Sequence, residues 1–172
     1  MKTLSIITIA LAACVLSACG GKGSSAAAGG DSTAMTLQKN EQTAWKTMVA
    51  FQNKNADSIY KACSADFVDY GTGEDKPVKN VDSLKASLKG LWAAFPDMTG
   101  HDLRIEGKGD TVIIWGTWTG TFKGAMGPVK PTGKSFKLID ADIFSFNKQG
   151  QITSHGSIQS MNTYFNQAGI KM

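Results

Sequence analysis

The 172-residue sequence is poor in cysteine, with only Cys14, Cys19 and Cys63. The first two lie in the N-terminal segment, so Cys63 stands alone in the rest of the chain. A disulfide within the chain and a cysteine-bound metal cluster are therefore excluded. We expect Cys63 to be buried as a small apolar residue, with a reactive thiol as the alternative.

Neither sign of charge dominates the sequence. The 18 basic and 14 acidic residues give a formal net charge of +4, and no basic run is interleaved with aromatic residues. We therefore expect no nucleic-acid partner. The two histidines, His101 and His155, lie far apart without clustered carboxylates, so the sequence predicts no metal site. His101, isolated in a loop, is at most a weak ligand candidate.

The first apolar run of the chain covers residues 4–15, follows Lys2, and is too short to span a bilayer. Residues 1–18 are therefore predicted to be a signal peptide. The letters LSAC at 16–19 resemble a bacterial lipobox, whose cysteine becomes the acylated mature N-terminus; palmitate is a typical acyl chain. We expect Cys19 to tether the protein to a membrane of the cell envelope. An ordinary cleavage site with a chance cysteine is the alternative.

The rest of the chain divides into a linker and one domain. Residues 19–35 are rich in Gly, Ser and Ala and are predicted to be flexible. Residues 36–172 suffice for one domain with a sizeable core. Their apolar spacing predicts helices first and strands afterwards, which indicates an α+β fold. The helices are expected at 38–53, 56–65, 80–95 and 162–169, and the strands at 66–70, 102–106, 111–122, 134–146 and 151–161.

Six short motifs occur in order along this domain: FPD at 95–97, EGKGDTV at 106–112, GPVKPTGK at 127–134, DIFSF at 142–146, GQI at 150–152 and NQAG at 166–169. Together they resemble the SnoaL-like polyketide cyclases, also called ester cyclases, of the NTF2-like superfamily. The resemblance implies a cone, in which a strongly curved antiparallel sheet wraps around helices and encloses a mostly apolar pocket. It also implies a homodimer.

Catalytic members of that family close a ring by an aldol step without metal or cofactor, using an acid/base aspartate on the last strand. The resemblance places that position on Ser160. A serine hydroxyl cannot replace a carboxylate, whose acid–base contribution is roughly 10²–10⁴-fold. We therefore expect a non-catalytic domain that binds a small apolar or amphiphilic molecule. A dimeric interaction module without a ligand is another hypothesis.

An enzymatic alternative rests on Asp142 and His155. A two-residue turn at 148–149 would pair them directly across a hairpin, as a dyad of a cyclase, isomerase or lyase. Strand alternation counted from Ser160, however, places Ile143 and Ile158 in the pocket and this pair on the opposite face. The aromatic residues beside the pair would then need cover from a dimer partner. A structural or interface pair, a catalytic dyad and solvated residues all remain open.

The tryptophans give two further ligand-binding candidates, Trp92 and Trp115. Trp92 lies on a helical apolar stripe, so a core position is the simpler interpretation. Trp115 and Trp118 have opposite strand parity, so at most one of them faces the pocket.

The lipid anchor yields the first testable prediction. Cys19→Ala should release the protein into the soluble fraction or leave an unprocessed precursor, because the acylated residue is lost. Membrane fractionation and mass spectrometry of the N-terminus measure both results. A variant that is still acylated and retained in membranes would contradict the lipoprotein hypothesis.

Overall fold

The structure is a computed structural model that describes residues 27–74 and 76–171. The predicted signal peptide and Cys19 lie outside the described residues. Within the described part, no helix is long and apolar enough to cross a membrane.

The described residues form four helices: α1 (Ala27–Gln52), α2 (Ala56–Tyr60), α3 (Val81–Ala94) and α4 (Met161–Ala168). The side chains of Asn55, Asn80 and Ser160 cap the last three by accepting a backbone N–H of the first turn. Gly169, with φ 70°, ends α4 in the left-handed conformation.

Helix α1 begins inside the segment predicted to be linker, so residues 27–35 are helical. The composition of this segment is rich in Gly, Ser and Ala, but alanine is also the best helix former. A helix that is already packed at its C-terminal half extends into this segment without a new nucleation step.

Five strands form one open sheet in the order β1-β5-β4-β3-β2. They are β1 (Cys63–Asp69), β2 (Thr99–Lys108), β3 (Thr111–Thr121), β4 (Ser135–Phe146) and β5 (Ile152–Ile158). The sheet is antiparallel except that β1 pairs parallel to β5. The predicted α+β class and the order of helices and strands are confirmed; the sheet is mixed rather than wholly antiparallel.

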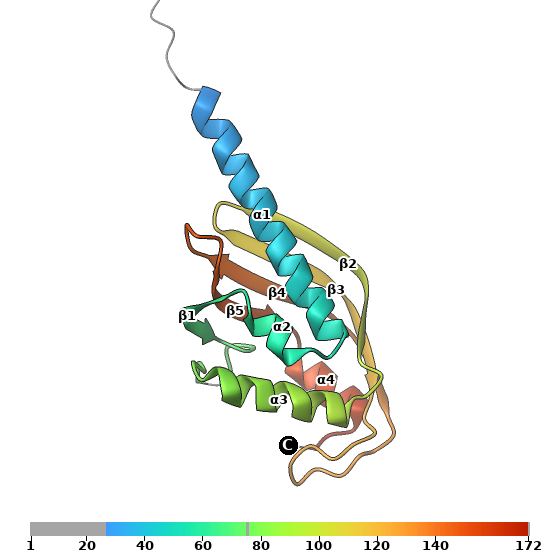
Figure 1. Cartoon of the computed structure of the whole chain (residues 1–172). Helices are drawn as coiled ribbons and strands as arrows, with labels where there is room; N and C mark the ends of the chain where they lie inside the picture. Colours follow the sequence, from blue (N-terminus) through green and yellow to red (C-terminus); the bar gives the residue numbers. More distant parts are fainter. Residues whose placement is uncertain (1–26, 75, 172) are drawn as a thin grey trace, which may run out of the picture.

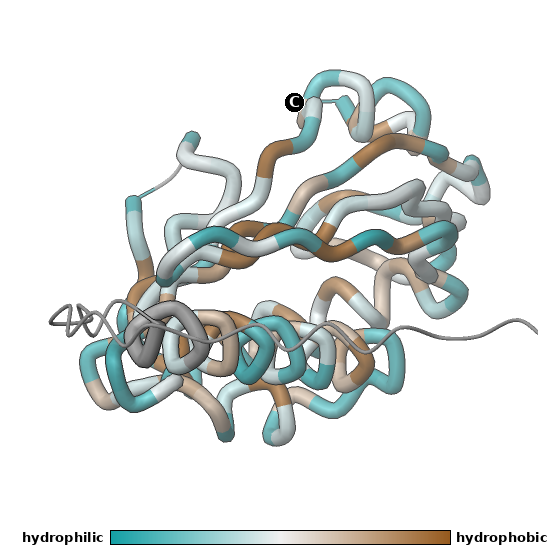
Figure 2. The backbone as a smooth tube through the Cα atoms, turned by 90° about the horizontal axis from the view of Figure 1, so that it is seen from above, coloured by the Kyte–Doolittle hydropathy of each residue, from teal (hydrophilic) through white to brown (hydrophobic). Residues whose placement is uncertain are grey.

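Helices α1, α2 and α3 lie across one face of the curved sheet, as Figure 1 shows. Apolar and polar residues alternate along the strands (Figure 2), as expected for a sheet with one covered face. The core forms between these layers around large buried side chains such as Phe95, Ile114, Phe122, Phe144 and Ile152.

The β4–β5 hairpin differs from its predicted register. Phe144 faces His155 and Asp142 faces Ser157, a shift of two residues from the expected pairing. The turn is longer than two residues, because the Asn147 Oδ1 accepts the backbone N–H groups of Gln149 and Gln151. A shift of two keeps the side chains of Asp142 and His155 on the same face. The two residues are therefore diagonal neighbours instead of the predicted direct pair.

The predicted assignment of the sheet faces is wrong. Asp140, Asp142 and His155 line the concave side, and their neighbours Phe136 and Phe144 are buried in the core. Ile139 and Ile158, by contrast, are 71% and 67% exposed. The reason is that β5 ends at Ile158 and Ser160 caps α4, so strand alternation cannot be counted back from Ser160.

Strand β2 approaches β3 closely at Gly116. Strand β2 is irregular between His101 and Arg104, where Asp102 has φ 52°. A Cβ atom at position 116 would lie 2.7 Å from the His101 carbonyl oxygen, far inside van der Waals contact. Glycine at this position therefore makes room for the irregularity in β2.

Candidate functional site

A cavity of about 110 Å³ lies between the helices and the concave face of the sheet. Helix α1 contributes Phe51, α2 contributes Tyr60, and β1, β3 and β4 contribute Phe67, Trp118 and Phe144. The lining is thus mainly apolar and aromatic, as in many small-molecule sites. The polar exceptions are Thr47, Asp69, Asp140, Asp142 and His155.

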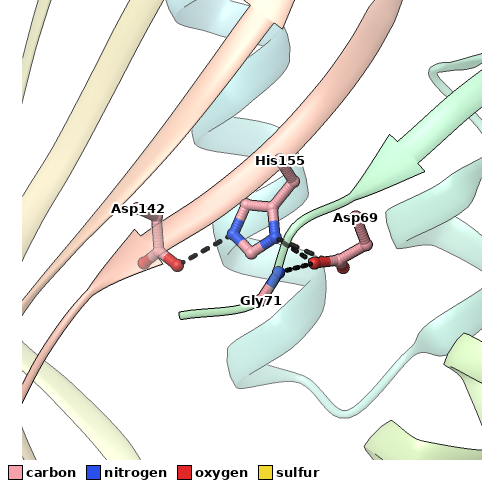
Figure 3. A network of polar contacts seen from close by, with 4 residues as sticks. All are labelled: Asp69, Gly71, Asp142 and His155. Carbon is pink, nitrogen blue, oxygen red and sulfur yellow. Dashed lines mark hydrogen bonds and ion pairs between the residues drawn. The ribbon is translucent and has the colours of Figure 1, made fainter. Parts of the chain in front are cut away.

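His155 is held between two carboxylates (Figure 3). Its Nε2 lies 3.1 Å from Asp142 Oδ1, and its Nδ1 lies 3.3 Å from Asp69 Oδ2. Asp69 Oδ1 also accepts the backbone N–H of Gly71 at 2.7 Å. Carboxylates only accept hydrogen bonds, so a doubly protonated ring satisfies both contacts. Neither ring nitrogen is left to bind a metal.

Asp69 joins this cluster from 86 residues away, through the parallel pairing of β1 with β5. The register sets Asp69 directly beside His155, and the Tyr70 N–H donates to the His155 carbonyl at 2.8 Å. Sequence reasoning missed Asp69 because it did not pair the first strand with the last. The available signal was an aspartate at the end of the predicted strand 66–70.

The two carboxylates keep the His155 ring charged. Burial disfavours the cation, but the hydrogen bonds and charges of Asp142 and Asp69 outweigh it and raise the pKa of His155 to about 10. Burial likewise disfavours ionised Asp69, yet His155 and the Gly71 N–H hold the pKa of Asp69 below its ordinary value. At neutral pH the ring is an imidazolium and cannot act as a base.

Asp140 is a second acidic group in the same cavity, two positions before Asp142 on β4. Its Oδ1 is buried and has no hydrogen-bond partner in the described part of the chain. Burial, reinforced by the charge of Asp142, raises the pKa of Asp140 to about 7. This carboxyl therefore exchanges its proton near neutral pH. Sequence reasoning missed it because the face assignment was inverted.

The proposed ligand-binding residues lie elsewhere. Trp92 packs in a separate small cluster with Ala50, Ala56 and Ile59 and does not line the cavity. Trp115, Ile143 and Ile158 do not line it either; they alternate with the buried residues on the convex side of the sheet. Trp118 lines the cavity and Trp115 does not, as expected for two residues of β3 that point to opposite faces of the sheet.

The remaining candidates are also placed. Ser160 is exposed at the start of α4, outside the cavity lining. His101 Nε2 lies 3.0 Å from Thr119 Oγ1 at an exposed position. Cys63 lines the cavity, where burial raises the pKa of its thiol to about 12. A thiol so rarely ionised is a poor nucleophile.

Comparison with known proteins assigns the family. The model of the SnoaL-like polyketide cyclases matches residues 42–168. The chain belongs to this family. No curated protein matches the sequence.

Solved SnoaL-like and related structures share the fold. AclR of Streptomyces galilaeus, described as a candidate hydroxylase, is 25% identical, with a TM-score of 0.66 over 77% of this chain and 82% of its own. IdmH of Streptomyces antibioticus, described as a candidate polyketide cyclase, is 23% identical, with a TM-score of 0.62 over 76% and 98%. A Jannaschia sp. CCS1 protein, named for the SnoaL-like cyclases, is 16% identical, with a TM-score of 0.71 over 80% and 96%. The expected NTF2-like α+β cone is thereby confirmed.

Membership of the family does not make Ser160 the residue that decides whether this chain is catalytic. The expectation of a non-catalytic domain depended on the absence of a carboxylate at Ser160. The observed cavity instead contains the carboxyls of Asp69, Asp140 and Asp142. The question of catalysis therefore depends on these groups.

The charged cluster predicts a pH dependence of stability. The pKa of His155 rises on folding from its ordinary 6.5 to about 10, so folded protein keeps a proton that unfolded protein releases in this interval. Its stabilisation is complete below pH 6.5 and is lost as pH rises towards 10. His155→Gln should lower the free energy of unfolding at pH 6 by roughly 3 kcal/mol, and by much less at pH 10.

Urea unfolding at several pH values measures this difference. His101→Gln, at the exposed site, is the matched control and should show no such pH-dependent loss. An equal loss for His155→Gln at pH 6 and pH 10 would contradict the charged state assigned to the ring.

Proposed function

We propose that this protein is a cofactor-free acid–base enzyme of the cyclase, isomerase or lyase type, acting on a small neutral molecule in the apolar cavity. The observation that carries the proposal is Asp140, a half-buried cavity carboxyl whose Oδ1 is buried without a hydrogen-bond partner among the described residues and whose pKa is raised to about 7. General acid–base catalysis is most efficient when the pKa of the group lies near the working pH. Asp140 is therefore assigned as the proton-transferring group.

The neighbouring charges tune this group. The Asp142 charge raises the Asp140 pKa, while the His155 charge lowers it by a smaller amount. His155 holds Asp142 in place through a 3.1 Å contact and is itself held by Asp69. Asp142, His155 and Asp69 thus act as positioning residues, and the dyad hypothesis is modified so that its histidine is not the base.

The cavity also limits the ligand. Its polar lining carries three carboxyls and one imidazolium, so an anionic ligand would be repelled. An apolar cavity of roughly 150 Å³ accommodates benzene, and the volume here is about 110 Å³. The ligand we infer is a neutral, mostly apolar molecule of about one small ring.

Binding without catalysis is the competing hypothesis. Its support is the serine at position 160, where the resemblance places the family's catalytic aspartate; Asp140 and Asp142 supply carboxyls to the cavity from other positions. It remains as an outcome of the test below.

Asp140→Asn is the decisive variant. We expect the wild-type protein to exchange the α-protons of cyclopentanone for deuterium, with a rate that rises through about pH 7, followed by proton NMR. The variant should lose the catalysed exchange by roughly 10²–10⁴-fold. Asp102→Asn, the same change at an exposed site on β2, is the control. Equal rates in both variants would contradict the role of Asp140, and cyclopentanone binding without exchange in the wild type would favour a binding protein.

The same variant has a stability signature. Between pH 3.8 and about 7, folded Asp140 keeps a proton that unfolded Asp140 releases, so its burial destabilises the protein increasingly over this range. Asp140→Asn should therefore be more stable than the wild type at pH 8 by roughly 1–3 kcal/mol, and the difference should shrink towards pH 4. Urea unfolding measures it. The raised pKa would be contradicted if the gain in stability of Asp140→Asn over the wild type were smaller at pH 8 than at pH 4.

We further propose that a second copy of the chain covers the convex face. Ile113, Ile139 and Ile158 are 36%, 71% and 67% exposed on this face, so a second copy that covers the face would bury three large apolar side chains. Arg104 and Glu106, both exposed, face Trp115 and Ile113 from β2. A rim with both signs of charge suits a two-fold interface, in which a patch meets itself. The anchor on Cys19, supported by the LSAC motif, likewise stays a proposal.

Sedimentation velocity tests the dimer. The double variant Ile139→Lys with Ile158→Lys should sediment as a monomer, because like charges would meet at the interface centre. Val49→Lys alters an apolar residue of α1 that is 41% exposed, in the helix layer, and should leave the dimer intact. A wild-type monomer at micromolar concentration would contradict the proposal.

A further inference from the structure

A second cavity-lining residue carries a buried polar atom without a hydrogen-bond partner. Among the cavity-lining side chains, Asp140 Oδ1 and Trp118 Nε1 are buried and make no hydrogen bond within the described residues. Trp118 is only 3% exposed. An indole N–H can only donate, and leaving such a donor unpaired costs roughly 1–3 kcal/mol. Buried donors in native proteins are nearly always satisfied, so an unpaired one beside a cavity points to a ligand.

The sheet register brings this donor near Asp140. On β3 and β4, Gly116 faces Asp140 and Trp118 faces Leu138, so Trp118 and Asp140 are diagonal neighbours on the concave side. Diagonal positions are about 7–8 Å apart, within reach of a long side chain. The donor and the carboxyl therefore belong to the same part of the cavity.

The indole ring is also held firmly. Phe51 packs edge-on against it, with ring centroids 5.3 Å apart and an interplanar angle of 89°. On another side, a Cβ atom at Gly100 would lie 3.1 Å from Trp118 Cζ2, so the ring lies against the β2 backbone. A donor fixed in this way loses little freedom when it binds an oxygen.

We propose that the Trp118 N–H donates a hydrogen bond to the carbonyl oxygen of the ketone on which Asp140 acts, and so stabilises the negative charge that develops there. This inference rests on the proposed function of Asp140. The Asp140 carboxylate takes the proton from the α-carbon, the C–H electron pair forms the new C=C bond, and the C=O π pair moves onto oxygen. Trp118 stabilises that oxygen, and Asp140 returns the proton to carbon, so no oxidant or further reactant is needed.

Trp118→Phe removes the N–H and keeps an aromatic ring. We expect it to slow the deuterium exchange of cyclopentanone roughly 100-fold, the usual effect of losing one donor to a developing oxyanion. Trp92→Phe is the matched control, because Trp92 is 6% exposed, has an unpartnered Nε1 and contacts Phe51, yet does not line the cavity. It should keep the wild-type rate.

A spectroscopic measurement separates this inference from the proposed function. In Asp140→Asn protein, bound cyclopentanone should show a lowered C=O stretching frequency, and adding Trp118→Phe should restore it. The indole ¹H–¹⁵N signal that Trp118→Phe removes should move when the ketone is added, whereas the Trp92 signal should stay. If both the C=O frequency and the Trp118 indole signal shift but the wild type exchanges no protons, the catalytic proposal is rejected and the hydrogen bond from Trp118 to the ketone is kept. If the ketone changes neither its C=O frequency nor the Trp118 indole signal, with or without proton exchange in the wild type, the role of Trp118 is overturned.

Discussion

The clamp of His155 between Asp142 and Asp69 is the interaction on which the rest of the site depends. It joins β1, β4 and β5, although the residues on β1 and β5 are 86 positions apart. The positive charge of His155 offsets the cost of burying the Asp69 carboxylate in a mainly apolar cavity and holds its pKa below the ordinary value. The charge of Asp142 in turn helps to keep the proton on Asp140 until near neutral pH.

The clamp and Asp140 have opposite effects on folding. The clamp stabilises the protein at neutral pH, whereas the burial of the Asp140 carboxyl destabilises it. Such a group persists in a structure most readily when it has a use, because a neutral side chain of the same size would make the domain more stable. Trp118, with its unpaired donor in the same cavity, fits the same pattern.

Local signals in the sequence were sufficient for much of the fold. Helical spacing, strand alternation and turn residues predicted the order of α2, α3 and the long strands, and the contact between Asp142 and His155 survived a two-residue change of register. The long-range features were not accessible in this way. The parallel pairing of β1 with β5, and therefore Asp69, leaves no periodic signal. Placing Ser160 on a strand rather than at a helix cap reversed the faces, and with them the ligand-binding assignments of Ile143 and Ile158.

Helix α1 has a mechanical consequence for the domain as a whole. Its core contacts begin near Leu37, and residues 32–36 ahead of it are exposed, so the helix stands out from the sheet as Figure 1 shows. At 1.5 Å per residue, the ten steps from Ala27 to Leu37 span about 15 Å. This stretch is a stiff arm, continuous with a packed helix. A continuous helix sets both the distance and the direction of the domain relative to Ala27, as a flexible segment would not.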